Sequence, residues 1–111
     1  AMHAFDFDLQ VHEEPGRTRL VLRGELDLGT APQVERVLQE ARDRGDAIDL
    51  DLRELSFMDS TGVRLLLVAS QDRAESDPPL RMFAPRESDA LVALEETGIL
   101  ELLPIADEGG A

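Results

Sequence analysis

Apolar and polar residues alternate in the first stretch of the chain. The residues Glu14-Pro15-Gly16 separate this stretch from a second one, residues 18–23, that is also rich in apolar side chains. A period of two is typical of a strand with one buried face, and the Pro-Gly pair favours a tight connection. The pattern predicts a hairpin of two strands, the first with apolar residues at Phe5, Phe7, Leu9 and Val11.

Helical spacing follows this hairpin. Thr30 and Gln33 are three residues apart, as in a capping box, and Pro32 stands in the first turn. We therefore expect a helix over about residues 31–44, ending at Gly45, with one apolar face made of Val34, Val37, Leu38 and Ala41.

Strand-like and helix-like segments alternate in the remainder of the chain. Residues 47–52 alternate apolar with acidic side chains, whereas residues 63–69 are apolar except for one arginine. Asp77-Pro78-Pro79 interrupts the chain before another short apolar stretch. These patterns predict a strand at 47–52, a helix after Asp59, a strand at 80–83 and a last helix over about 87–97 that ends at Gly98.

The expected order of elements is β-β-α-β-α-β-α, which indicates an α/β fold in a single domain. Helical crossovers between the later strands require parallel pairing, so we expect a mixed sheet of about four to five strands. Because apolar residues alternate with acids at 47–52, the helices should pack mainly on one face and water should cover the other. We place the domain at residues 3–105 and a flexible C-terminal tail at 106–111.

The charge of the chain limits its partners. The formal net charge is −13, and all eleven basic residues are arginines. Although acidity can serve solubility alone, so acidic a surface repels nucleic acid and anionic membranes. We therefore expect protein partners, with no direct nucleic-acid or membrane binding.

Missing residue types exclude several kinds of chemistry. Without lysine there is no phosphate-loop lysine and no Schiff base, and without cysteine there is no disulfide or zinc–thiolate site. No apolar run reaches the roughly 18 residues of a membrane span, and no secretory signal is evident. A cytoplasmic location is expected.

The residues Asp59-Ser60-Thr61-Gly62 stand where a strand gives way to a helix. Asp59 is the expected N-cap, which places Ser60 at the start of the helix. A phosphate on Ser60 would meet free backbone donors and the positive end of the helix dipole. These residue types are also favoured as caps alone, so the segment by itself does not prove a modification site.

Neither nucleophilic catalysis nor metal binding fits this segment. Nucleophilic catalysis by Ser60 lacks a partner, because the two histidines, His3 and His12, lie near the N-terminus and no nucleophile elbow surrounds the serine. Glu25, Asp27 and Asp59 have no metal-loop spacing. A solvated acidic face, including Asp49 and Asp51, explains the acids better, so we expect no enzyme, metal or cofactor.

A second segment, Gly24-Glu25-Leu26-Asp27, precedes the first expected helix and by itself reads as a connecting loop. Taken with Phe57-Met58-Asp59-Ser60-Thr61-Gly62-Val63 about thirty residues later, it resembles the anti-sigma factor antagonists of the STAS domain family. The resemblance covers nearly the whole chain.

The resemblance implies a switch made by phosphorylation. In this family the serine after the motif aspartate, here Ser60, is phosphorylated by an anti-sigma factor that is itself a serine kinase. The unphosphorylated antagonist binds that kinase and releases a sigma factor, and a PP2C-type phosphatase restores binding. The acid of the first motif falls on Asp27. The expected partner-binding residues are Glu25, Asp27, Asp59, Ser60, Thr61, Gly62 and Arg64.

One departure and one alternative accompany this interpretation. Arg64 stands where the family often has a second glycine, which bears on the identity of the partner. The alternative is a STAS scaffold that is never phosphorylated, such as a regulatory subunit of a transport or signalling complex. Ser60 and Thr61 would then serve as caps and contact residues.

Overall fold

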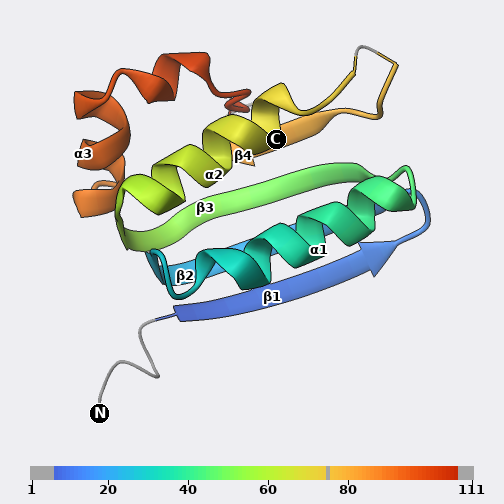
Figure 1. Ribbon diagram of the computed structural model, residues 1–111, viewed down its shortest axis with the longest axis horizontal. Coiled ribbons are helices and arrows are strands. Elements are labelled where there is room, and N and C mark those ends of the chain that lie inside the picture. The colour runs from blue at the N-terminus through green and yellow to red at the C-terminus, as the bar shows by residue number, and fades with distance from the viewer. Residues whose placement is uncertain (1–6, 75, 108–111) are drawn as a thin grey trace.

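The computed structural model describes residues 7–74 and 76–107, and their four strands form one mixed sheet in the order β1-β2-β3-β4. β1 pairs with β2 in antiparallel fashion, while β2–β3 and β3–β4 are parallel. This confirms the expected mixed sheet (Figure 1). The strands are β1 (Phe7–Glu14), β2 (Arg17–Leu26), β3 (Ala47–Met58) and β4 (Leu80–Phe83).

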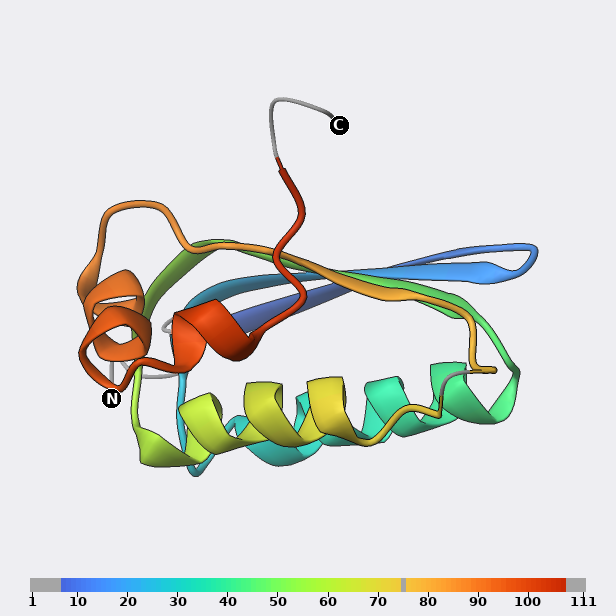
Figure 2. The same ribbon diagram turned by 90° about the horizontal axis from the view of Figure 1, so that it is seen from above.

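The helices lie on one face of this sheet, as Figure 2 shows with the sheet seen edge-on. α1 and α2 run side by side beneath the strands, and α3 packs against β3 at one end. A short 3₁₀ helix, η2, follows α3 and was not expected. The bounds are α1 (Ala31–Asp43), α2 (Ser60–Gln71), α3 (Asp89–Glu96) and η2 (Ile99–Leu102).

β3 is twice as long as the predicted strand at 47–52. Its second half was missed because bulges interrupt the alternation of apolar and polar residues. The register with β2 shifts between Val21 and Arg23, and again between Gly24 and Glu25. At each shift β3 advances one residue more than β2, which resets the face that its side chains point to. Buried residues therefore recur at spacing three, at Leu52, Leu55 and Met58.

The core lies between the sheet and the helices α1 and α2. Its completely buried leucines come from the two central strands, from α2 and from α3. They include Leu20, Leu22, Leu50, Leu52 and Leu66.

The expectation of a solvated acidic face at Asp49 and Asp51 is wrong. These residues are only 5% and 4% exposed. Arginines of the neighbouring strands cover them: Arg17 and Arg81 bond Asp49, at 2.7 and 3.0 Å, and Arg19 bonds Asp51 at 2.7 Å.

An aromatic ring lies among these arginines. The guanidinium carbons of Arg19, Arg53 and Arg81 lie 5.2–5.6 Å from the centre of the Phe83 ring, within the range of cation–π attraction. The face away from the helices is therefore a packed layer of paired charges.

The segment after η2 returns to the sheet beside β4. Ile105 forms a bridge with Met82, and Ala106 donates its backbone N–H to the carbonyl of Met82 at 2.7 Å. Of the expected tail at 106–111, residues 108–111 lie outside the described residues, as does Phe5 at the other end. Among the described residues, no helix is both long and apolar enough to cross a membrane.

Candidate functional site

Asp59 caps α2, as the sequence predicted. Its backbone is extended, and its Oδ1 accepts a hydrogen bond from the backbone N–H of Gly62 at 3.0 Å. This bond satisfies one donor of the first helical turn and fixes where the helix starts. Ser60 is therefore held as the first helical residue.

The same carboxylate also holds the loop between β2 and α1. Asp59 Oδ2 accepts the backbone N–H of Leu28 at 3.2 Å, and the Asp59 N–H donates to the carbonyl of Leu26 at 3.2 Å. The two sequence motifs thus lie side by side. One carboxylate oxygen of Asp59 bonds the loop and the other bonds the start of α2.

Gly62 allows this close approach. A Cβ at this position would lie 2.5 Å from the carbonyl oxygen of Leu26 and 3.1 Å from Cβ of Met58. Gly62 is buried, so it acts beneath the site by letting α2 begin against the end of β2, and it presents no side chain to a partner.

The loop that carries Asp27 is held by its own hydrogen bonds. Asp27 Oδ1 accepts the backbone N–H groups of Gly29 and Thr30, at 3.0 and 3.1 Å. The Thr30 hydroxyl accepts the Asp27 N–H at 2.9 Å and donates to the carbonyl of Glu25 at 3.0 Å. The expected capping box of Thr30 is therefore wrong, because this hydroxyl is bonded back into the loop and does not cap α1.

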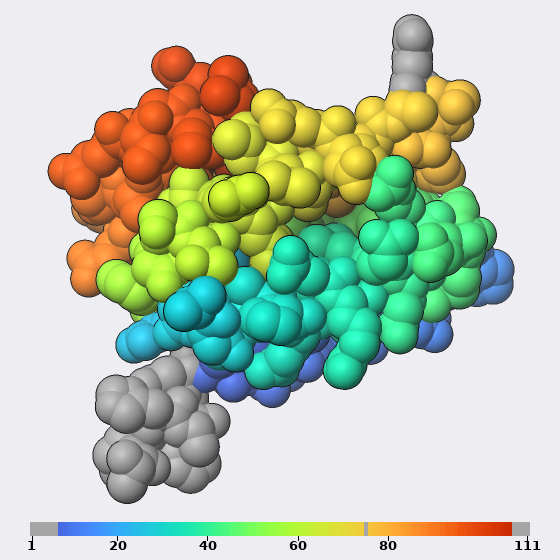
Figure 3. Space-filling view, in the orientation of Figure 1, coloured from blue at the N-terminus to red at the C-terminus, as the bar shows by residue number. Residues whose placement is uncertain are grey.

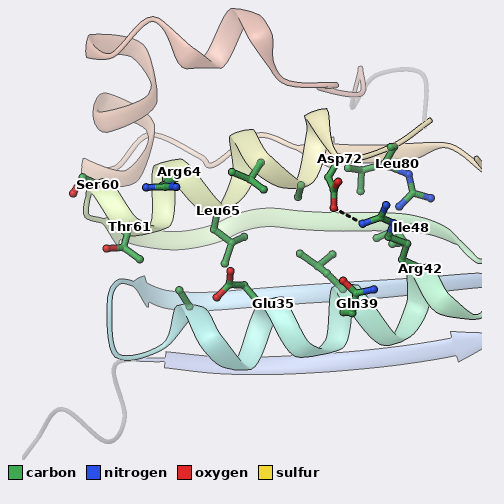
Figure 4. Close-up of a pocket in the computed structure, with 15 residues that line it drawn as sticks. Glu35, Gln39, Arg42, Ile48, Ser60, Thr61, Arg64, Leu65, Asp72 and Leu80 are labelled. Carbon is green, nitrogen blue, oxygen red and sulfur yellow. Dashed lines mark hydrogen bonds and ion pairs between the residues drawn. The ribbon is translucent and has the colours of Figure 1, made fainter. Parts of the chain in front are cut away.

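The predicted contact residues surround the start of α2. Ser60 and Arg64 are exposed, while Glu25, Asp27 and Thr61 are half-buried. In Figure 4, Thr61 lies on the side of α2 that faces α1, and Ser60 lies at the end of the helix. Within the described part of the chain, the Ser60 side chain forms no hydrogen bond, so its hydroxyl is available to another molecule.

Two grooves flank α2 and meet at Ser60. The larger, about 710 Å³, lies between α1 and α2 and forms the furrow at the front of Figure 3. The smaller, about 480 Å³, lies between α2 and the segment formed by α3 and η2. Ser60 and Arg64 line both grooves, so a molecule bound at this end of either groove would contact them.

The sequence analysis missed two exposed apolar residues near this site. Leu28 is 73% exposed at the tip of the loop that Asp59 holds, and Phe57 is 39% exposed on β3 beside Glu25. An apolar residue between Asp27 and Gly29, in an otherwise polar loop, was the available signal for Leu28. The described residues contain no cluster of His, Cys, Asp and Glu side chains suited to a metal ion.

Known proteins agree with this architecture. The family described as "Mlab, STAS domain" matches residues 9–103. The anti-sigma-B factor antagonist of Listeria monocytogenes is 32% identical over 93 residues, which is 82% of this chain and 80% of that protein, and its counterpart in Listeria innocua matches equally.

Solved structures share the fold at lower sequence identity. An anti-sigma factor antagonist from Mycobacterium paratuberculosis superposes with a TM-score of 0.75 at 20% identity, covering 89% of this chain and 84% of that one. Unphosphorylated SpoIIAA superposes with a TM-score of 0.72 at 23% identity, covering 93% and 91%, and the phosphorylated Bacillus protein gives 0.66, covering 93% and 95%. From its family match, its curated relatives and its fold, this chain is a member of the STAS domain family.

Proposed function

We propose that this protein is an anti-sigma factor antagonist with a phosphorylation switch at Ser60. Unphosphorylated, it binds an anti-sigma factor that is a serine kinase, and a sigma factor is released. The observation that carries the proposal is the position of Ser60: exposed, without an internal hydrogen bond, and at the meeting point of two grooves. The names of the Listeria relatives support the same role.

The modification is a phosphoryl transfer from ATP bound to the partner. The Ser60 Oγ forms a bond to the γ-phosphorus, the bond from that phosphorus to the β,γ-bridging oxygen breaks, and ADP leaves. The hydroxyl proton passes to a base of the kinase. This protein contributes only the acceptor, and the proposal gives it no enzymatic activity of its own.

The added charge explains why binding ends while the fold persists. A phosphoserine carries about −1.5 to −2 charges at neutral pH, and here it would adjoin the carboxylate of Asp59 in a chain of net charge −13. Asp59 and Gly62 anchor the helix from the inside, so a group on the exposed Ser60 side chain leaves these contacts in place. A partner surface that fits the unmodified site would then have to accommodate a phosphate dianion, and binding is weakened for this reason.

The other predicted residues have distinct parts in this proposal. Glu25, Asp27 and Thr61 border the docking surface, and Arg64 lies beside Ser60 on the exposed side of α2. A PP2C-type phosphatase would remove the phosphate and restore binding. A basic docking face on the kinase suits the acidic charge of this chain.

Affinity capture from lysate of the source cell tests the function. Unmodified protein, Ser60→Asp and the control Ser76→Asp serve as baits, since Ser76 is exposed beyond the other end of α2. We expect the unmodified protein and Ser76→Asp to capture an ATP-binding anti-sigma factor, and Ser60→Asp to lose it. Capture of the same transport or scaffold proteins by all three baits would contradict the proposal and favour a non-phosphorylated STAS subunit.

A further inference from the structure

Arg64 differs from the other arginines that line the two grooves. Arg42 is ion-paired with Asp72 between α1 and α2, and Arg73 donates to the carbonyl of Pro78 at 2.7 Å. Arg64 is exposed and has no hydrogen bond or ion pair within residues 7–74 and 76–107. Its guanidinium is therefore available for a ligand that the unmodified chain does not supply.

The spacing on α2 brings Arg64 to Ser60. Residues i and i+4 lie one turn apart on the same side of a helix, and an anion four residues before a cation is the favoured orientation of such a pair. Both side chains line the same two grooves, which confirms that they share a surface. In Figure 4 the Arg64 side chain lies over the first turn of α2, next to Ser60.

Carboxylates adjoin Ser60 or share its grooves, together with the already bonded Arg42 and Arg73 of the larger groove. Asp59 precedes Ser60, Glu35 of α1 lines the larger groove, and Glu96 of α3 lines the smaller one. Of the described residues that line the smaller groove, Arg64 is the one cation. Among the described residues that line these grooves with Ser60, Arg64 is the arginine with an unpaired guanidinium, whose planar array of donors matches phosphate oxygens.

We propose that Arg64 binds the phosphate of phosphorylated Ser60 within the same helix. This inference depends on the proposed function in one respect, which is that Ser60 is phosphorylated in the cell. Phosphorylation then changes the surface twice: it adds a dianion, and it withdraws from the partner a cation that the unmodified protein presents beside Ser60. Arg64 is a phosphate-binding residue in one state and a docking residue in the other.

Phosphorus NMR on protein with phosphoserine installed at position 60 during translation tests this pairing directly. The second pKa of the phosphate is measured in otherwise unmodified protein, in Arg64→Gln and in Arg36→Gln. Arg36 is an exposed arginine of α1 that lines neither groove, so the control removes the same charge elsewhere.

A cation bound to the phosphate favours its dianion and lowers this pKa. We expect Arg64→Gln to raise the pKa by about 0.3 units or more, from the strength of helical i,i+4 pairs, and Arg36→Gln to change it by less than a third of that. Arg64→Lys should retain part of the effect, and added salt should shrink the difference.

Equal pKa values in Arg64→Gln and Arg36→Gln would overturn the inference. Because the phosphate is installed without a kinase, this outcome would leave the proposed switch standing. Conversely, a positive result would stand even if no kinase partner were captured.

Discussion

Asp59 Oδ2 accepts the backbone N–H of Leu28 at 3.2 Å, across 31 positions of sequence, while its Oδ1 caps α2 at Gly62. One carboxylate thus holds the most exposed leucine of the described chain at a fixed place beside Ser60. The start of α2 and the loop before α1 are therefore bonded to each other through Asp59, which places Leu28 at the same end of the molecule as Ser60.

Removing the Asp59 side chain should loosen both elements together. Loss of an N-cap costs about 1 kcal/mol, within a range of about 0.5–2, so Asp59→Ala should lower the free energy of unfolding by this amount. Amide hydrogen exchange should accelerate at Leu28 as well as at Gly62. Acceleration at Gly62 alone would show that the Leu28 bond contributes nothing to holding the loop.

Gly62 should not tolerate a methyl group. The Cβ of Gly62→Ala would lie 2.5 Å from a backbone oxygen, which cannot move as a flexible side chain can. We expect a loss of about 1–3 kcal/mol in the free energy of unfolding, measured by urea denaturation. Gly29→Ala is the matched control, since its Cβ would meet only the Asp27 carboxylate at 3.5 Å. Equal stabilities of the two variants would contradict the close packing of α2 on β2.

Acid should destabilise the outer face of the sheet. Burial raises the pKa of Asp49 and Asp51, but hydrogen bonds and charges from Arg81 and Arg17 at Asp49, and mainly from Arg53 at Asp51, outweigh it and leave each pKa below its usual value. The stabilisation of the folded protein by these two carboxylates is therefore complete above the unfolded-state pKa of about 3.9. It is lost as the pH falls through their lower pKa in the folded state.

Unfolding by urea at a series of pH values between neutrality and pH 2 measures this effect. Asp49→Asn should be less stable than the unmodified protein at neutral pH, and the difference should narrow in the acid range. A difference that stays constant with pH would mean that the ion pairs of Asp49 do not contribute through its charge.

Leu28 should matter for binding and not for folding. Because its side chain is 73% exposed, Leu28→Ala should leave the free energy of unfolding within about 0.5 kcal/mol of its original value. If the side chain enters an apolar pocket of the captured kinase, its loss should weaken binding about tenfold or more. Leu102→Ala, at a leucine 65% exposed on η2, serves as the control and should bind normally. Equal binding by both variants would remove Leu28 from the interface.

The order of elements and the cap at Asp59 could be predicted from the sequence because both depend on local residue patterns. The burial of Asp49 and Asp51 was missed because the arginines Arg17, Arg19 and Arg81 that cover them lie on other strands, 32 positions away in sequence. In sequence, a strand whose acids are covered in this way has the same alternation of apolar and acidic residues as a strand with a solvated acidic face. The length of β3 was missed because its bulges change the spacing of buried residues from two to three.

The site was predictable in part for the same reason. Motif spacing was enough to propose Ser60 and Asp27 as candidate residues, but the bond from Leu28 to Asp59 and the contact of Gly62 with Leu26 depend on how β2 and α2 pack. The Thr30 hydroxyl matched a capping box in sequence, yet its competing bonds to Glu25 and Asp27 form in the folded loop.

The most direct test of the account is the dissociation constant of the captured anti-sigma factor for this protein with serine, and with phosphoserine, at position 60. Isothermal titration calorimetry with both forms would measure it, with circular dichroism to confirm that each is folded. We expect binding at least tenfold weaker for the phosphorylated form, about 1.4 kcal/mol in binding free energy, with the fold unchanged. Equal affinity of the two folded forms would contradict a switch at Ser60.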